Sequence, residues 1–269
     1  MDYGIIPARL PKTAWRIAGY ELGALKELAK RILPAPVRRW MRVTHVRVSE
    51  RPPFNMVRWG SLRRVTPIHS GWGVGRGNYI DRYYIERYLE QNATCIRGRV
   101  LEVTVNDYTV RFGGNRVTKS DVLDMRPDYP LATIVADLTD AGDIPSDSFD
   151  CVILTQVLNF IYDVKAAIRT IHRILKPGGC VLVSVAGISQ MAHEEMEYCG
   201  DYWRFTGISL RRLFEEVFPP TNVTVEAHGN VLTAIAFLHG LALEELHSDE
   251  LDYRDPNFEV SVLLKAVKP

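Results

Sequence analysis

Acidic residues lie in or at the ends of three successive apolar runs of the sequence, at positions where a parallel sheet would place a ligand. Glu102 lies in the run that ends at Asn106, Asp121 closes the next run, and Asp137 closes the third. In open parallel sheets, ligands bind beyond the carboxyl ends of the strands. A carboxylate after the second strand can accept both hydroxyls of a ribose, and one after the third can accept from an adenine amine. One such acid alone is as readily a loop or helix cap, but three in this order predict a nucleoside site.

The elements that would position these acids are strands that alternate with helices from residue 99 onward. Apolar runs predict strands at 99–104, 115–123, 132–138, 149–158 and 180–187, and we expect the second to end at Asp121. Helical spacing predicts helices at 79–91 and from 163, the latter ended by Lys176–Gly179. Residues 222–238 and 257–269 are expected to finish the sheet with antiparallel strands. Such alternation predicts an α/β fold with helices on both faces.

Residues 79–269 resemble the class I S-adenosylmethionine-dependent methyltransferases. The resemblance rests on GRVLEVT, on the acid of KSDVL, and on the block from SDSFD through LKPGG, with GDYWRFT and SLRRLFEEVF after the fifth strand. It implies a Rossmann-like, seven-stranded sheet and S-adenosylmethionine as cofactor. The string RRVTPIHSGWGVGRGNYIDRYYIERYL is similar to bacterial methyltransferases found beside sugar and natural-product genes.

The resemblance implies a role for each residue at the strand ends. Glu102 would orient the turn near the cofactor's amino group, and Asp121 would bind the ribose hydroxyls. Asp137 and the Leu138 backbone would meet the adenine, and Gln156 would face the methionine or sulfonium region.

The first turn departs from the family's glycine-rich pattern. Thr104 occupies the position of the usual first glycine, among the cofactor-binding residues, and a β-branched side chain fits poorly where a positive φ is required. On the preceding helix, Arg82 or Tyr83 would close over the cofactor carboxylate, although a solvated charged helix with aromatic core contacts is an equal alternative. The run Gly71–Gly77 does not follow a strand, so we expect a flexible lid or turn there and no dinucleotide fingerprint.

The segment after the fifth strand supplies the residues predicted to act on the methyl acceptor. His193 is a candidate general base, because histidine exchanges protons near neutral pH, and Tyr202 is the second candidate catalytic residue. Trp203 is expected to stack on an acceptor ring, and Arg204 to bind an acidic group or to pair with a neighbouring carboxylate. The alternative is that Tyr202 and Trp203 are core residues. The fifth run ends without an acid, so we expect no metal ion.

Charge is distributed unevenly along the 269 residues. Residues 1–70 hold 14 Lys and Arg against 4 Asp and Glu, whereas the remainder holds 19 against 28. We therefore predict a basic, mostly helical extension at 1–70 and a methyltransferase domain at 71–269, with a helix at 12–33 that packs on the body or makes a weak membrane-surface contact. An acidic body argues against nucleic acid as a partner. The absence of a signal peptide and of CxxC pairs predicts a cytoplasmic protein.

These features predict methyl transfer to a small molecule, most simply to a hydroxyl of a sugar or natural product. Two alternatives remain open. One is an enzyme of the same fold that keeps S-adenosylmethionine but catalyses a non-methylating reaction. The other is a catalytically inactive binding module, in which the missing glycines mark a lost cofactor. The oligomeric state is not predicted.

Overall fold

The computed structural model describes residues 54–193 and 199–269, together with residues 34, 36, 37 and 52. The chain divides into two compact units, residues 1–63 and residues 64–269. The helix expected at 12–33 lies outside the described residues. In the first unit, Gly60–Leu62 forms a short 3₁₀ turn. The boundary expected between residues 70 and 71 therefore stays a prediction.

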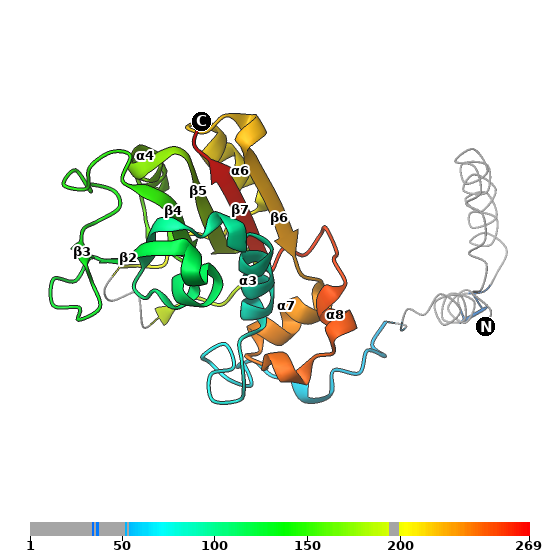
Figure 1. Ribbon diagram of the computed structural model, residues 1–269. Helices are drawn as coiled ribbons and strands as arrows, with labels where there is room; N and C mark the ends of the chain where they lie inside the picture. The colour runs from blue at the N-terminus through cyan, green and yellow to red at the C-terminus, as the bar shows by residue number, and fades with distance from the viewer. Residues whose placement is uncertain (1–33, 35, 38–51, 53, 194–198) are drawn as a thin grey trace, which may run out of the picture. The chain divides into compact units, whose positions relative to one another are not determined.

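The second unit is built on a seven-stranded sheet in the order β3-β2-β1-β4-β5-β7-β6 (Figure 1). Parallel pairing joins β1 to β2 and β4, β2 to β3, and β4 to β5, whereas β7 pairs antiparallel with both β5 and β6. The predicted Rossmann-like methyltransferase sheet is confirmed. The strands are β1 (Gly98–Val103), β2 (Val117–Asp124), β3 (Ile134–Val135), β4 (Phe149–Thr155), β5 (Leu175–Ala186), β6 (Val223–His228) and β7 (Ser261–Val267).

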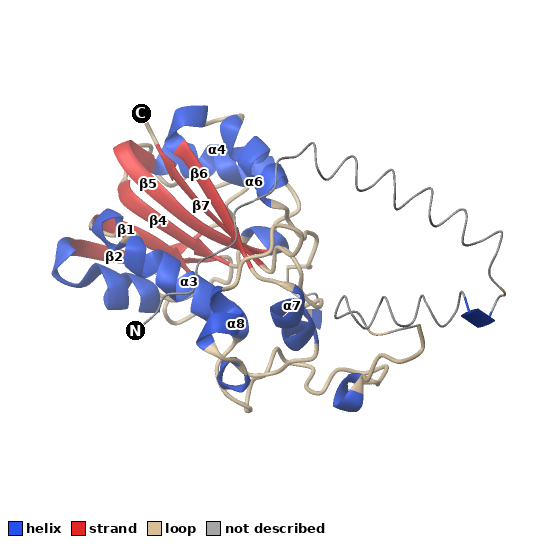
Figure 2. Ribbon diagram, turned by 90° about the vertical axis from the view of Figure 1, so that its right-hand side faces the viewer, coloured by secondary structure: helices blue, strands red, loops and turns tan. Residues whose placement is uncertain are grey.

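Helices cover both faces of the sheet (Figure 2). The first face carries α4 (Val164–Ile174) and α6 (Gly207–Glu215), whose buried side chains join Leu101, Val152 and Leu154 in one core. The second carries α3 (Ile80–Gln91), α7 (Val231–Leu238) and the short α8 (Ser248–Asp252), which form another core with Val100 and Ile153. Alternate residues of one strand thus serve two cores, so the central strands read as unbroken apolar runs.

Polar caps fix where three of these helices begin. The Asp163 carboxylate accepts a hydrogen bond from Ala166 N at 2.9 Å at the start of α4. Thr206 and Ser209 form a capping box on α6, and Asn230 and Thr233 form one on α7. Each cap satisfies backbone N–H groups that the first helical turn leaves without partners.

Four expectations about the elements are wrong. The second strand continues past Asp121 to Asp124, and the third is limited to Ile134–Val135. Residues 231–238 form α7 and are not strand, since the Asn230 cap starts a helix. Helix α4, expected from residue 163, ends at Ile174, and β5 begins at Leu175. Lys176–Gly179 therefore belongs to the strand and does not cap the helix. No helix in the described part of the chain is long and apolar enough to cross a membrane.

Candidate active site

The turns that follow β1 and β4 have strained backbones. Thr104 has a φ of 70° and Gln156 a φ of 57°, and both directly follow the last residue of neighbouring parallel strands. A left-handed conformation costs a non-glycine residue about 1–2 kcal/mol. A backbone hydrogen bond ties each turn to a neighbouring strand. Thr104 N donates to Leu123 O of β2 at 2.9 Å, and Gln156 N donates to Ser184 O of β5 at 2.8 Å. Strain held in this way gathers at functional sites, so this edge is the candidate site.

Glu102 holds the segment that follows the first turn. Its side chain is buried, and its carboxylate accepts from Thr109 N at 2.8 Å, from Thr109 Oγ1 at 2.7 Å and, more weakly, from Tyr108 N at 3.4 Å. Burial raises the pKa of Glu102, and the bonds from Thr109 oppose that shift. Glu102 thus holds residues 108–109 in place, while its role toward a cofactor stays a prediction.

Helix α3 reaches the same segment through Arg82. The Arg82 guanidinium donates to the Tyr108 hydroxyl and lies 5.4 Å from the centroid of the Tyr108 ring. On its other side it lies 5.8 Å from the centroid of the Tyr79 ring. Arg82 therefore ties the first turn of α3 to the turn that Glu102 holds.

A pocket of about 210 Å³, which we call the edge pocket, opens where β4 and β5 end. Gln156 and Ala186 line it at the strand ends, and Asp81 and Arg82 line it from α3. Burial raises the pKa of the Asp81 carboxyl, and the charge of Arg82 opposes that shift. A carboxylate and a guanidinium from consecutive residues thus line a single small cavity.

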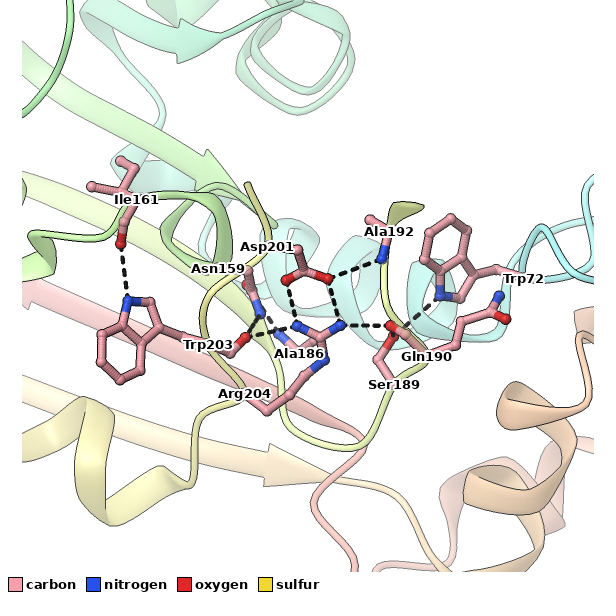
Figure 3. A network of polar contacts seen from close by, with 10 residues as sticks. All are labelled: Trp72, Asn159, Ile161, Ala186, Ser189, Gln190, Ala192, Asp201, Trp203 and Arg204. Carbon is pink, nitrogen blue, oxygen red and sulfur yellow. Dashed lines mark hydrogen bonds and ion pairs between the residues drawn. The ribbon is translucent and has the colours of Figure 1, made fainter. Parts of the chain in front are cut away.

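An ion pair braces the loops on the far side of the edge pocket (Figure 3). Arg204 donates to both carboxylate oxygens of Asp201, at 2.6 and 2.7 Å, and to Gln190 O at 2.6 Å. Ala192 N donates to Asp201 at 2.9 Å. Burial would raise the pKa of Asp201, but the bonds from Arg204 and Ala192 N leave it below its ordinary value.

The same network attaches both loops to the sheet and to residues 71–77. Asn159 donates to Trp203 O at 2.8 Å and accepts from Ala186 N at 3.3 Å. Trp72 Nε1 donates to Ser189 Oγ at 3.1 Å. Two buried N–H groups of the lining, Gln190 Nε2 and Arg204 Nε, have no hydrogen-bond partner among the described residues. They are donors that a ligand oxygen could satisfy.

The glycine-rich run 71–77 forms turns held against residues 241–245. Gly73 has a φ of 94°, and a Cβ there would lie 2.9 Å from Leu241 O, so only glycine fits this contact. Arg76 pairs with Glu245 at 2.5 Å, and Asn78 Nδ2 donates to Glu244 at 2.6 Å. Of the two expectations for this run, a flexible lid or a turn, the structure shows the turn. Its residue Trp72 lines the edge pocket.

The end of β2 lies at Asp124 and not at Asp121, the acid that the sequence placed there. Asp121 lies inside the strand, where its buried carboxylate pairs with Arg99 at 2.6 Å and Lys119 at 3.2 Å. The sequence had placed Asp121 at the end of the strand. That expectation is wrong, because three further strand residues follow it. Asp124 closes the strand instead and pairs with Arg126 Nε at 2.9 Å.

The other expected cofactor residues lie at different distances from the edge pocket. Gln156 and Arg82 line it. Asp137 is exposed beyond β3 and accepts from Thr139 N at 2.8 Å, while the Leu138 side chain is in the first core. Tyr83 turns to another pocket, where its hydroxyl donates to Asp252 at 2.8 Å. Tyr83 therefore cannot close over the edge pocket in this arrangement.

Of the expected acceptor residues, only Arg204 lines the edge pocket. His193 is exposed, and its charge is among the influences that lower the pKa of Asp201. Tyr202 and Trp203 are 50% and 40% exposed and contact Tyr162 at ring distances of 5.3 and 6.1 Å. They form an exposed aromatic cluster and are not core residues.

Sequence reasoning missed Asp81, Asp124, Asn159 and Gln190 as site residues. Asp81 lies in the first turn of α3, where acids commonly stabilise the helix end. An acid at this position therefore does not by itself indicate a binding site. Asp124 could have been found, because the apolar pair Val122–Leu123 precedes it. In the described residues, no group of three His, Cys, Asp or Glu side chains is arranged to hold a metal ion.

Comparisons with known proteins match parts of the chain. A family model described as "Methyltransferase domain" matches residues 73–183. The ubiquinone/menaquinone biosynthesis C-methyltransferases UbiE of Enterobacter sp. (strain 638) and Pasteurella multocida (strain Pm70) are 30% and 33% identical to this chain over 86 residues. Each match covers 32% of this chain and only 32% and 30% of those relatives, about a third of their length.

One solved structure among those similar to this chain is phosphoethanolamine N-methyltransferase 2 of Haemonchus contortus in complex with S-adenosyl-L-methionine. It is 17% identical, with a TM-score of 0.48, and the match covers 78% of this chain and 55% of that one.

Proposed function

We propose, from the premise that this chain belongs to the class I S-adenosylmethionine-dependent methyltransferase superfamily, that it methylates a hydroxyl group of a small sugar or natural product. The observation that carries this proposal is the edge pocket, where Asp81 and Arg82 lie beside Gln156 at the end of β4. A neighbouring carboxylate and guanidinium complement the ammonium and carboxylate of an amino acid. The methionine part of S-adenosylmethionine carries both groups.

The remaining strand ends suit the adenosine part. We assign the ribose hydroxyls to Asp124, whose carboxylate closes β2, in place of the Asp121 expected from the sequence. Asp137 and the Leu138 backbone remain the proposed adenine contacts. Glu102 and Thr104 would act through the turn, since Glu102 fixes residues 108–109 and Thr104 holds the positive φ usually given to glycine. These residues fit the cofactor.

Bound S-adenosylmethionine would supply a methyl group on its sulfonium. The acceptor oxygen would attack that carbon in line with the breaking S–C bond, and S-adenosylhomocysteine would leave. The protein's contribution is then mainly alignment. Gln190 Nε2 and Arg204 Nε, the buried donors without described partners, would hold oxygens of the acceptor. The exposed cluster of Tyr202 and Trp203 would contact its ring. His193 would take the hydroxyl proton, and Tyr202 would assist in orienting the acceptor.

Calorimetry with S-adenosylmethionine and the full chain tests the cofactor assignment. We expect Asp81→Asn to weaken binding about tenfold or more, the scale of a lost charged hydrogen bond. The matched control is Asp249→Asn on α8, an exposed acid outside the edge pocket, which should bind as the unaltered chain does. Equal affinity of both variants would remove Asp81 from the cofactor site.

Labelled cofactor then separates the alternatives. Binding without transfer to any of a panel of hydroxylated acceptors, but with another product, favours the non-methylating enzyme. No binding at all favours the inactive module. Both curated relatives are named C-methyltransferases, so the product analysis should distinguish methyl on carbon from methyl on oxygen. The cytoplasmic location and the natural-product role belong to the same proposal.

A further inference from the structure

A second pocket, of about 320 Å³, lies between α3, β6 and the segment that contains α8. It shares no lining residue with the edge pocket. Tyr83, Tyr84 and Tyr88 enter it from α3, and Glu226 and His228 enter it from β6. We call it the α8 pocket. Its lining contains Tyr83, which the sequence had assigned to the cofactor.

Hydrogen bonds and ring contacts fix the walls of the α8 pocket. The Tyr84 ring stacks on His228 with centroids 5.4 Å apart, and its hydroxyl donates to Leu251 O at 3.1 Å. Tyr83 lies edge-on against Tyr84 at 5.5 Å and donates to Asp252. The lining is therefore already organised without a ligand.

The charges of the α8 pocket leave one cation uncommitted. Asp252 pairs with Arg87, and Glu226 lies 3.3 Å from His228 Nε2. Arg254 has neither a hydrogen bond nor an ion pair to any described residue, and only its longer-range charge acts on Glu226. Asp252 is held by Arg87 and Glu226 contacts His228, so the guanidinium of Arg254, which has no described partner, is the charged group of this lining left to receive an anion.

Tyr88 adds a buried donor. Its side chain is 5% exposed, and its hydroxyl has no hydrogen-bond partner in the described part of the chain. Burial raises the pKa of Tyr88 well above its ordinary value, so the phenol keeps its proton. A buried hydroxyl without a partner is unfavourable, and a ligand oxygen in the α8 pocket would satisfy it.

We propose that the α8 pocket binds a small organic oxyanion, a carboxylate or a phosphate ester, with its charge on Arg254 and an oxygen accepting from Tyr88. Its volume is at the lower end of the range for small-molecule sites, roughly 300–1,000 Å³, which limits the ligand to a ring or short chain. The site is separate from the edge pocket, so this proposal does not depend on methyl transfer.

Thermal shift and calorimetry on the full chain test it, with benzoate, phenyl phosphate and butylammonium as probes. We expect one of the two anions to raise Tm saturably. Arg254→Gln should weaken that anion about tenfold or more, the range for a lost hydrogen bond between charged groups. The control Arg212→Gln, an exposed residue of α6 on the other face of the sheet, should leave the affinity unchanged.

Tyr88→Phe gives an independent readout. Without anion, the variant should be at least as stable as the unaltered chain, because it loses a hydroxyl that lacks a partner. With anion, its rise in Tm should be smaller, whereas Tyr253→Phe, which changes an exposed phenol, should respond as the unaltered chain does. Benzoate and phenyl phosphate together decide between a carboxylate and a phosphate ligand.

Several results would overturn the proposal. They are no response to either anion, a response to butylammonium alone, or equal anion affinity with and without Arg254. Arg254→Lys, which keeps the charge, replaces the glutamine variant if that one does not fold. Calorimetry with S-adenosylmethionine on Arg254→Gln should give unchanged affinity; a loss there would assign Arg254 to the cofactor and contradict a separate site.

Discussion

Thr104 and Gln156 show how single residues shape this edge of the sheet. Both adopt positive φ values directly after neighbouring strands, where a glycine would cost least. The sequence identified Thr104 as a residue in a glycine position, since the motif around it is recognisable. Nothing in the sequence signalled the conformation of Gln156, because it depends on the bond from its N–H to β5.

Replacing Thr104 by glycine should stabilise the protein. The substitution removes a left-handed strain of about 1–2 kcal/mol and adds a chain-entropy cost of roughly 0.5–1 kcal/mol, so we expect a gain of up to about 1.5 kcal/mol in the free energy of unfolding. Urea unfolding measures it. Thr118→Gly, at an exposed position inside β2, should instead lose stability. A loss of similar size in both variants would contradict the strain.

The two aspartates of β2 should respond differently to substitution. Asp124→Asn should weaken S-adenosylmethionine binding by about 1–3 kcal/mol, the cost of a lost charged hydrogen-bond partner. Asp121→Asn should leave the affinity unchanged and lower the free energy of unfolding by a similar amount, because Arg99 loses its carboxylate partner. Calorimetry and urea unfolding on both variants separate the roles. The reverse pattern would restore Asp121 to the ribose.

At the scale of elements, sequence periodicity predicted the long, regular ones and failed at short ones. Helices α3 and α4 have clear apolar spacing, and both form close to their expected bounds. Residues 231–238 are a short apolar run, which fits a strand or a buried helix equally, and only the Asn230 capping box decides. Asp201 and Arg204 lie three residues apart in a loop, and no local pattern announces that their pairing braces the pocket.

That brace should make the fold sensitive to acid. Asp201 has a pKa below its unfolded value of about 3.9, so its carboxylate stabilises the fold above that value. The contribution is lost as the pH falls through the folded-state pKa. Asp201→Asn should therefore lower the free energy of unfolding at pH 7 by about 1–3 kcal/mol and flatten the loss of stability below pH 4.

Unfolding in urea from pH 7 down to pH 2.5 measures both effects. Asp163→Asn, at the exposed cap of α4, is a control that keeps its capping ability and should change neither value much. An acid limb as steep in Asp201→Asn as in the unaltered chain would assign the acid sensitivity to other carboxylates.

At the scale of the molecule, the basic residues of the N-terminal region, except Arg64, belong to one unit of the chain and the sheet belongs to the other. All seven strands and both cores lie within residues 64–269. We expect a chain of residues 64–269 to fold with the same circular dichroism and S-adenosylmethionine affinity as the full chain. Failure to fold would mean that residues 1–63 complete a core.

The same pair of chains tests the membrane-surface alternative for the basic region. If the basic residues contact only the rest of the protein, neither chain should float with anionic vesicles at low salt. Retention of the full chain alone, lost at high salt, would support surface binding by residues 1–63, because salt screens attraction to an anionic surface.

The position of β7 sets the order in which this fold can be completed during synthesis. It is the last strand to leave the ribosome, yet it pairs with β5 on one side and β6 on the other. Until Ser261–Val267 emerges, β5 and β6 each have a strand edge whose N–H and C=O groups lack the neighbour that β7 provides. Such edges favour association with other chains. The growing polypeptide is therefore most exposed to aggregation shortly before its final strand closes the sheet.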